Sequence, residues 1–66
     1  MMLDWLIAIR EARGLSQKAV SAAVGVSQPT YWEYEHGQST PSVPIAKKIA
    51  AVLGFDWTLF YEGKPA

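Results

Sequence analysis

Residues 16–37 read SQKAVSAAVGVSQPTYWEYEHG, and this stretch decides the fold of the chain. Ser16 and Ser27 each stand before a helix-compatible run, as N-cap residues whose hydroxyl accepts a hydrogen bond from the first helical turn. Gly25 ends the first run, at the position that glycine favours after a helix. The stretch therefore predicts two short helices that meet at the turn of residues 24–27, and such a glycine-containing turn is typical of a helix-turn-helix.

The second helix of this pair should begin after Ser27 and stop at Gly37, with Pro29 in its first turn, where a missing N–H is harmless. At 100° per residue, Tyr31 and Tyr34 fall on one side of this helix, and we expect both in the core. The opposite side is then presented to a partner. It carries Gln28, Pro29, Trp32, Glu33 and His36.

The remaining segments also read as helices. Residues 3–13 are rich in helix-compatible side chains and lack turn residues. A further helix with one apolar face is expected between Ser42 and Gly54, and Asp56 should cap a last short turn. The sequence thus predicts an all-α fold, a compact five-helix domain with a central helix-turn-helix.

Length and composition limit what such a chain can be. Its 66 residues suffice for one domain, so we expect residues 1–66 to form a single unit with a frayed tail at 62–66. No cysteine is present and His36 is the only histidine, so neither a metal site nor a cofactor is expected. No apolar run approaches the ~20 residues of a membrane span, and Asp4 precedes the first apolar stretch, where a signal peptide is basic. The expectation is a cytoplasmic protein that does not contact a membrane.

Charge and chemistry narrow the function classes. The chain shows no nucleophile–base pair, phosphate-binding glycine loop or set of metal ligands, so we expect neither an enzyme nor a small-molecule ligand. Six basic and six acidic residues give zero net charge, whereas a nucleic-acid-binding domain usually has a basic face. A neutral sum can still contain a dipole. We expect Arg13 and Lys18 to flank the presented face, and Asp4, Asp56 and Glu62 to lie on the far side.

Several short motifs occur in one order and spacing along the chain. They are Leu15-Ser16-Gln17, Val24-Gly25-Val26-Ser27-Gln28, Glu35-His36-Gly37, Pro41-Ser42, Lys48-Ile49-Ala50 and Leu53-Gly54. Through these motifs, residues 3–61 resemble the lambdoid phage repressor and Cro family, also called the xenobiotic-response-element family. The resemblance implies a lambda-repressor-like domain that binds operator DNA, usually as a homodimer.

The resemblance also assigns roles to particular residues. It implies that Gln17 contacts a phosphate, and that Arg10 and Glu35 tie the first helix to the third as a structural pair. Gln28 lies in the first turn of its helix, where a glutamine can bond an adenine edge through two hydrogen bonds. The expected DNA-binding set is Gln17, Lys18, Gln28, Pro29, Thr30, Trp32, Glu33, Gln38, Ser39 and Thr40.

Two departures from the family pattern bear on DNA affinity. Residues 38–40 match a loop that touches the sugar-phosphate backbone, and many relatives carry lysine or arginine there, whereas this loop is uncharged. Trp32 and Glu33 stand where small or polar residues are common. The carboxylate of Glu33 repels phosphate, although it can accept a hydrogen bond from cytosine N4.

The C-terminal segment is the expected dimer contact. Trp57 and Phe60 are three residues apart and should face the core, which would leave Leu59 exposed. Relatives often carry a polar residue at the position of Leu59. The dimer candidates are Trp57, Leu59 and Tyr61, and we expect a homodimer with double-stranded DNA as its partner, at least when bound to DNA.

These observations predict a DNA-binding transcriptional regulator of the phage repressor and Cro type, which reads operator DNA in the major groove with the helix 28–36. The alternative is a protein-interaction or antitoxin-like module on the same fold, with weak or no DNA binding. Neutral charge and Trp32 favour this alternative, and Trp32 is either an exposed contact residue or tucked against the first helix. A positive surface around Gln17 and Gln28 would favour DNA, and a flat or negative one a protein partner.

Overall fold

The computed structural model describes residues 2–62, and within them the chain is helical, without a strand. Its elements are α1 (Asp4–Ala12), α2 (Gln17–Val24), α3 (Gln28–Glu35), α4 (Val43–Leu53) and the 3-10 helix η1 (Trp57–Tyr61). The predicted all-α class is confirmed. The count of five is reached only with η1, because the last segment is a short 3-10 helix and not an α-helix.

The predicted frayed tail lies almost wholly outside the described residues, apart from Glu62, which is exposed and follows η1. Within residues 2–62, no helix has both the length and the apolar character needed to cross a membrane.

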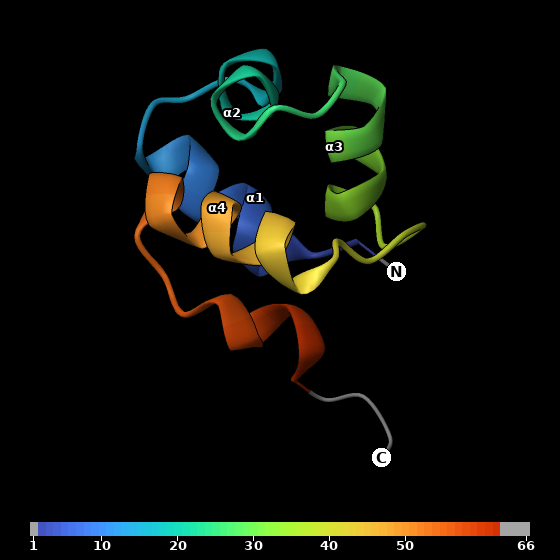
Figure 1. Ribbon diagram of the computed structural model, residues 1–66. Helices are drawn as coiled ribbons and strands as arrows, with labels where there is room; N and C mark the ends of the chain where they lie inside the picture. Colours follow the sequence, from blue (N-terminus) through green and yellow to red (C-terminus); the bar gives the residue numbers. More distant parts are fainter. Residues whose placement is uncertain (1, 63–66) are drawn as a thin grey trace.

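The corner between α2 and α3 is built from two serine caps and a glycine. The Oγ atoms of Ser16 and Ser27 each accept a hydrogen bond from the N–H three residues later, at 3.0 and 3.2 Å. Gly25 has a φ of 80°, in the left-handed region that glycine enters without steric cost, and its N–H donates to the carbonyl of Ser21. Figure 1 shows α2 end-on and α3 along its length, so the two helices cross at a wide angle.

Apolar side chains from every helix meet in one core. Tyr31 is fully buried, and Tyr34 packs against it edge to face with 6.4 Å between the ring centroids. Because both tyrosines face inward, as predicted, the opposite side of α3 is left at the surface. The buried cluster consists of Leu6, Val20, Val24, Tyr31, Tyr34, Ala46, Ile49, Leu53 and Phe60.

An aromatic group joins the C-terminal helix to the rest of the domain. The ring of Trp5 lies 5.2 Å from that of Phe55 and 5.4 Å from that of Phe60, both in edge-to-face geometry. This packing holds η1 below α4, on the side of the domain away from the corner of α2 and α3 (Figure 1). η1 is therefore remote from the corner of α2 and α3, but its last residue, Tyr61, reaches the carbonyl of Pro41 in the segment after α3.

Candidate nucleic-acid interface

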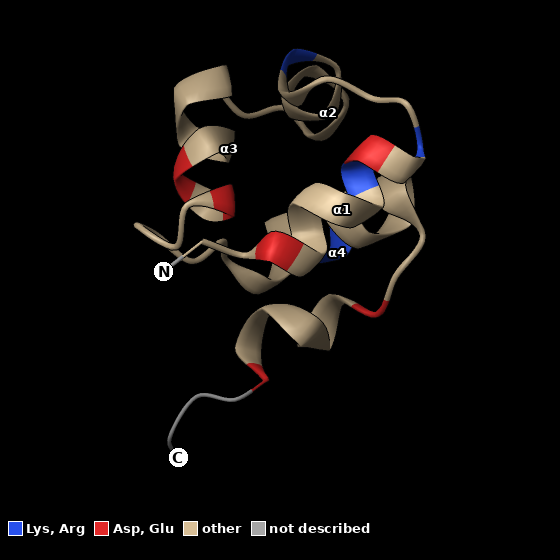
Figure 2. Cartoon of the chain, turned by 180° about the vertical axis from the view of Figure 1, so that it is seen from behind, with Lys and Arg blue, Asp and Glu red and all other residues tan. Residues whose placement is uncertain are grey.

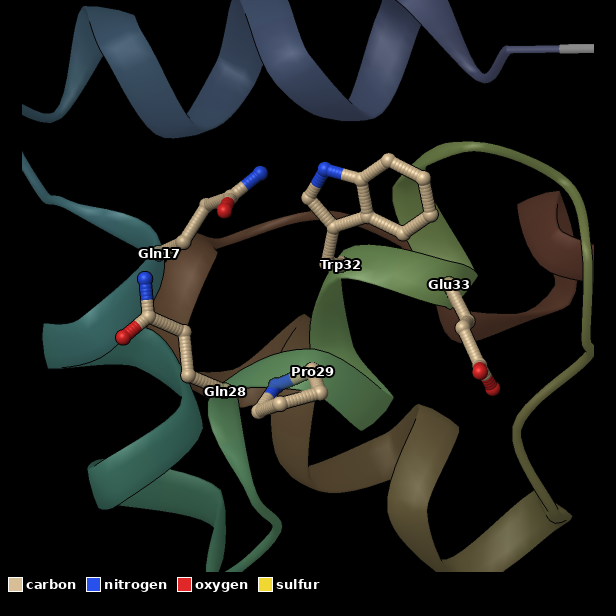
Figure 3. A pocket seen from close by; sticks show the side chains of 5 residues that line it. All are labelled: Gln17, Gln28, Pro29, Trp32 and Glu33. Atoms are coloured by element: carbon tan, nitrogen blue, oxygen red, sulfur yellow. The ribbon is translucent and has the colours of Figure 1, made fainter.

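The exposed side of α3 and one residue of α2 enclose a surface hollow of about 360 Å³ (Figure 3). Gln17 comes from α2, and the other four lining residues come from α3, with spacings of one, three and four that place them on one side of the helix. In Figure 3 the two glutamine amides lie on one side of Pro29 and the carboxylate of Glu33 lies on the other. The structure thus brings together Gln17, Gln28, Pro29, Trp32 and Glu33.

Trp32 is exposed on this face, with 39% of its surface accessible. Its indole stacks on the ring of His36, with 3.7 Å between centroids and 16° between planes. The Nδ1 atom of His36 lies 2.9 Å from the carbonyl oxygen of Trp32, which keeps the imidazole under the indole. The spacing of four residues on a helix is the signal from which this stack could have been predicted.

Behind the exposed face lies an ion pair that joins α1 to α3. The Nε atom of Arg10 is 2.6 Å from Oε2 of Glu35, and Nη2 donates to Oε1 of the same carboxylate at 3.3 Å. The side chain of Glu35 is fully buried and that of Arg10 is 12% exposed. The Nη1 atom of Arg10 donates a third hydrogen bond, to the carbonyl of Leu15 at 2.9 Å, so the guanidinium is held by both Glu35 and Leu15.

Gln17 belongs to the same network. Its Nε2 atom donates to Oε1 of Glu35 at 2.9 Å, so one amide hydrogen of the predicted phosphate contact is already used inside the protein. Burial by itself would raise the pKa of Glu35, but the hydrogen bonds from Arg10 and Gln17 outweigh burial and hold this pKa below its ordinary value. The hydrogen bond to Glu35 also raises the pKa of Arg10, so the pair stays ionised.

The remaining members of the predicted DNA-binding set lie around this face. Lys18 is exposed in the first turn of α2. Thr30 is half-buried, and its Oγ1 accepts a hydrogen bond from Ser27 Oγ at 2.8 Å. The loop that follows α3 is tied to its end, because the N–H groups of Gln38 and Ser39 donate to the carbonyl of Glu33 at 3.0 and 3.4 Å. Thr40, next in this loop, is exposed.

The charges around the face differ from those predicted. Arg13 does not flank it, because its Nε donates to the carbonyl of Leu53 at 2.9 Å and closes the end of α4. Lys18 is the only charged residue of α2, and α3 contains two glutamates and no basic residue (Figure 2). Asp4 begins α1, and the N–H of the residue before it, Leu3, donates to the carbonyl of Glu35 at the end of α3. The hollow therefore carries one carboxylate and no basic side chain.

The dimer candidates of η1 are largely engaged within the chain. Leu59 is half-buried, whereas the sequence predicted that it would be exposed. The rings of Trp57 and Tyr61 are 5.9 Å apart, and the Tyr61 hydroxyl donates to the carbonyl of Pro41 at 2.7 Å. Lys47 Nζ lies 5.2 Å from the centroid of the Trp57 ring. The half-buried rings of this segment pack against the core rather than forming a separate apolar patch.

Comparison with known proteins gives one family and two relatives. A family model described as helix-turn-helix matches residues 6–60. A Bacillus subtilis (strain 168) protein named as an HTH-type transcriptional regulator, YqaF, is 42% identical over 62 residues, which cover 94% of this chain and 82% of the relative. A Haemophilus influenzae protein, also named as an HTH-type transcriptional regulator, is 36% identical over 53 residues, which cover 80% of this chain and 54% of the relative.

Proposed function

The chain belongs to the Cro/C1-type helix-turn-helix family, and from this membership we propose that it is a DNA-binding transcriptional regulator that reads operator DNA with α3 in the major groove. The observation that carries the proposal is the exposed side of α3, where Gln28, Pro29, Trp32 and Glu33 line one hollow at the helix-turn-helix corner.

Within this proposal, Gln28 reads adenine. It lies at the N-terminal end of α3, which enters the groove first, and its amide can both accept from adenine N6 and donate to N7. Pro29 has no N–H and therefore offers shape and apolar contact only, such as with a thymine methyl. We expect a half-site with adenine opposite Gln28 and thymine beside it.

The backbone contacts are proposed for residues that border this face. Lys18 is the basic side chain available on α2, and the loop of residues 38–40 is held against the end of α3 by the carbonyl of Glu33. Gln17 uses one amide hydrogen for Glu35, so its second hydrogen is the one that would reach a phosphate. We propose that Thr30 adds a hydroxyl contact at the start of α3.

We also propose that two copies bind together, through η1. To read two half-sites, such a dimer would have to hold its two α3 helices ~34 Å apart, which is one turn of DNA. The surface that η1 offers for this contact is small. Leu59 and the rings of Trp57 and Tyr61 are half-buried in the monomer, so the contact would use the part of each side chain that remains at the surface.

The proposal is tested by selecting bound sequences from a library of random duplex DNA. The wild type should enrich a half-site with adenine at one position, and Gln28→Ala should lose ~1–3 kcal/mol of discrimination at that base pair. Gln38→Ala is the matched control, because it removes the same amide from the backbone loop and should weaken all sequences alike. No enriched duplex, or an unchanged preference in Gln28→Ala, would overturn the proposal.

One observation favours a second candidate, a protein-interaction module on the same fold. The hollow holds no basic residue, and the exposed Trp32 is a typical anchor for a protein partner. If Trp32→Ala abolishes binding to a protein while Gln28→Ala leaves DNA binding intact, this second function replaces the first.

A further inference from the structure

We propose that the hollow on α3 is selective for 5-methylcytosine in duplex DNA. The inference rests on the proposed function, since it names the base that this face prefers once α3 enters the major groove. It follows from two features that lie side by side: a carboxylate that needs a hydrogen-bond donor, and an apolar surface that can cover a methyl group.

The carboxylate belongs to Glu33. This side chain is exposed and makes no hydrogen bond or ion pair to any other residue within 2–62. In a DNA complex it would lose water, so it needs a donor on a base edge to replace that water. The major-groove edge of cytosine presents the N4 amino donor alone, whereas guanine presents two acceptors and thymine presents O4. Adenine offers N6 but places the N7 acceptor next to it.

The apolar surface is formed by Pro29 and Trp32. Pro29 precedes Trp32 by three residues and Glu33 by four, so all three side chains are neighbours on the helix surface. The stack on His36 holds the Trp32 indole in one orientation, so this surface is formed before DNA arrives. In Figure 3 the proline lies between the carboxylate and the glutamine amides, beneath the indole.

A methyl group on carbon 5 of cytosine stands directly beside the N4 amino group on the same groove edge. A base with both groups would place the amine at Glu33 and the methyl group at Pro29 and Trp32. Cytosine lacks the methyl group, and thymine has the methyl group but turns the O4 acceptor toward the carboxylate. Among these bases, 5-methylcytosine alone satisfies both features.

The experiment uses the full chain. Bound duplexes are first selected from two random libraries, one synthesised with cytosine and one with 5-methylcytosine, and an enriched duplex is taken from these selections. One pyrimidine of the half-site is then varied among cytosine, 5-methylcytosine, uracil and thymine, each opposite its pairing partner. These four bases separate the methyl group from the N4 donor. Binding of 5-methylcytosine should be about fourfold tighter than that of cytosine, which is the value of burying one methyl group. It should be about tenfold tighter than that of thymine, because the donor is replaced by an acceptor.

Two variants assign the two effects to their residues. Trp32→Ala should abolish the methyl effect and keep the preference for cytosine over uracil. Glu33→Gln should abolish that preference and keep the methyl effect, since a glutamine can both donate and accept. Lys18→Ala is the control and should weaken binding to all four duplexes by the same factor.

The possible outcomes distinguish a failure of the 5-methylcytosine preference from a failure of the proposed DNA-binding function. If an enriched duplex binds cytosine and 5-methylcytosine equally, the inference is wrong and the regulator function stands. The inference is also wrong if the methyl effect survives in Trp32→Ala. If neither library gives an enriched duplex, the proposed DNA-binding function itself fails.

Discussion

Replacing Glu35 with alanine should nearly unfold the protein, because this residue is one half of a buried ion pair. Its carboxylate is fully buried and accepts hydrogen bonds from Arg10 at 2.6 and 3.3 Å and from Gln17 at 2.9 Å. The Glu35→Ala variant would leave the guanidinium of Arg10, only 12% exposed, without its negative partner. Breaking a buried pair from one side costs ~3–5 kcal/mol.

That cost is large against the stability of so small a domain. A chain of 66 residues is expected to have a free energy of unfolding of about 3–10 kcal/mol. Because 1 kcal/mol shifts the melting temperature of a small domain by roughly 4–8 °C, the Tm of Glu35→Ala should fall by at least about 12 °C. Circular dichroism at 222 nm during heating measures this directly.

Glu33→Ala is the matched control, because it makes the same chemical change two residues earlier on the same helix. Glu33 is exposed, so its replacement should change stability by less than ~0.5 kcal/mol. A double variant, Arg10→Met with Glu35→Leu, should recover much of the lost stability, since neither charge is then stranded. Equal melting temperatures for Glu35→Ala and Glu33→Ala would refute the assignment of the buried pair.

Three further outcomes are expected. Hydrogen bonds from Arg10 and Gln17 hold the pKa of Glu35 below its ordinary value, so its contribution to stability should be complete above the unfolded-state pKa and lost as the pH falls through the folded-state pKa. Urea midpoints measured against pH should therefore decline in acid less steeply for Glu35→Gln than for the wild type. The logarithm of DNA affinity should fall with the logarithm of salt concentration on a shallow slope, because each neutralised phosphate adds about −0.9 to the slope and Lys18 is the one basic residue of α2 and α3. A titration that gives a slope near −10 would contradict this expectation. Leu59→Asp should reduce dimer formation on DNA in sedimentation experiments, and a wild type that stays monomeric on its operator would rule out the proposed η1 contact.

The local architecture of the helix-turn-helix could be predicted because its signals act over a few residues. Ser16 and Ser27 cap the helices that follow them, since a hydroxyl needs only the next turn as its partner. The same holds for the inward side of α3, where a helical period of 3.6 residues places Tyr31 and Tyr34 together. The presented face of Gln28, Pro29, Trp32 and Glu33 followed from this period by elimination.

The surface charges and the C-terminal segment could not be predicted in the same way. A neutral composition does not reveal that Arg13 closes the end of α4, because its acceptor is the carbonyl of Leu53, 40 residues away. Leu59 was expected to be exposed on helical spacing, but it is half-buried, because η1 packs on α4 and helical spacing within one segment does not reveal that contact. The segment proposed for dimerisation therefore exposes less of Leu59 than the sequence predicted.

The sequence by itself determined the helices, the side-chain caps of α2, α3 and η1, and the exposed side of α3, because each depends on residues within one or two turns of one another. Resemblance to a family suggested the pair of Arg10 and Glu35, but only the tertiary structure showed how deeply it is buried. Only the tertiary structure decided that Gln17 bonds Glu35, 18 residues along the chain, and thereby links the exposed side of α3 to the buried pair. The physical reason is that partners so far apart meet only through the packing of α1, α2 and α3, and no local pattern of side chains records that meeting.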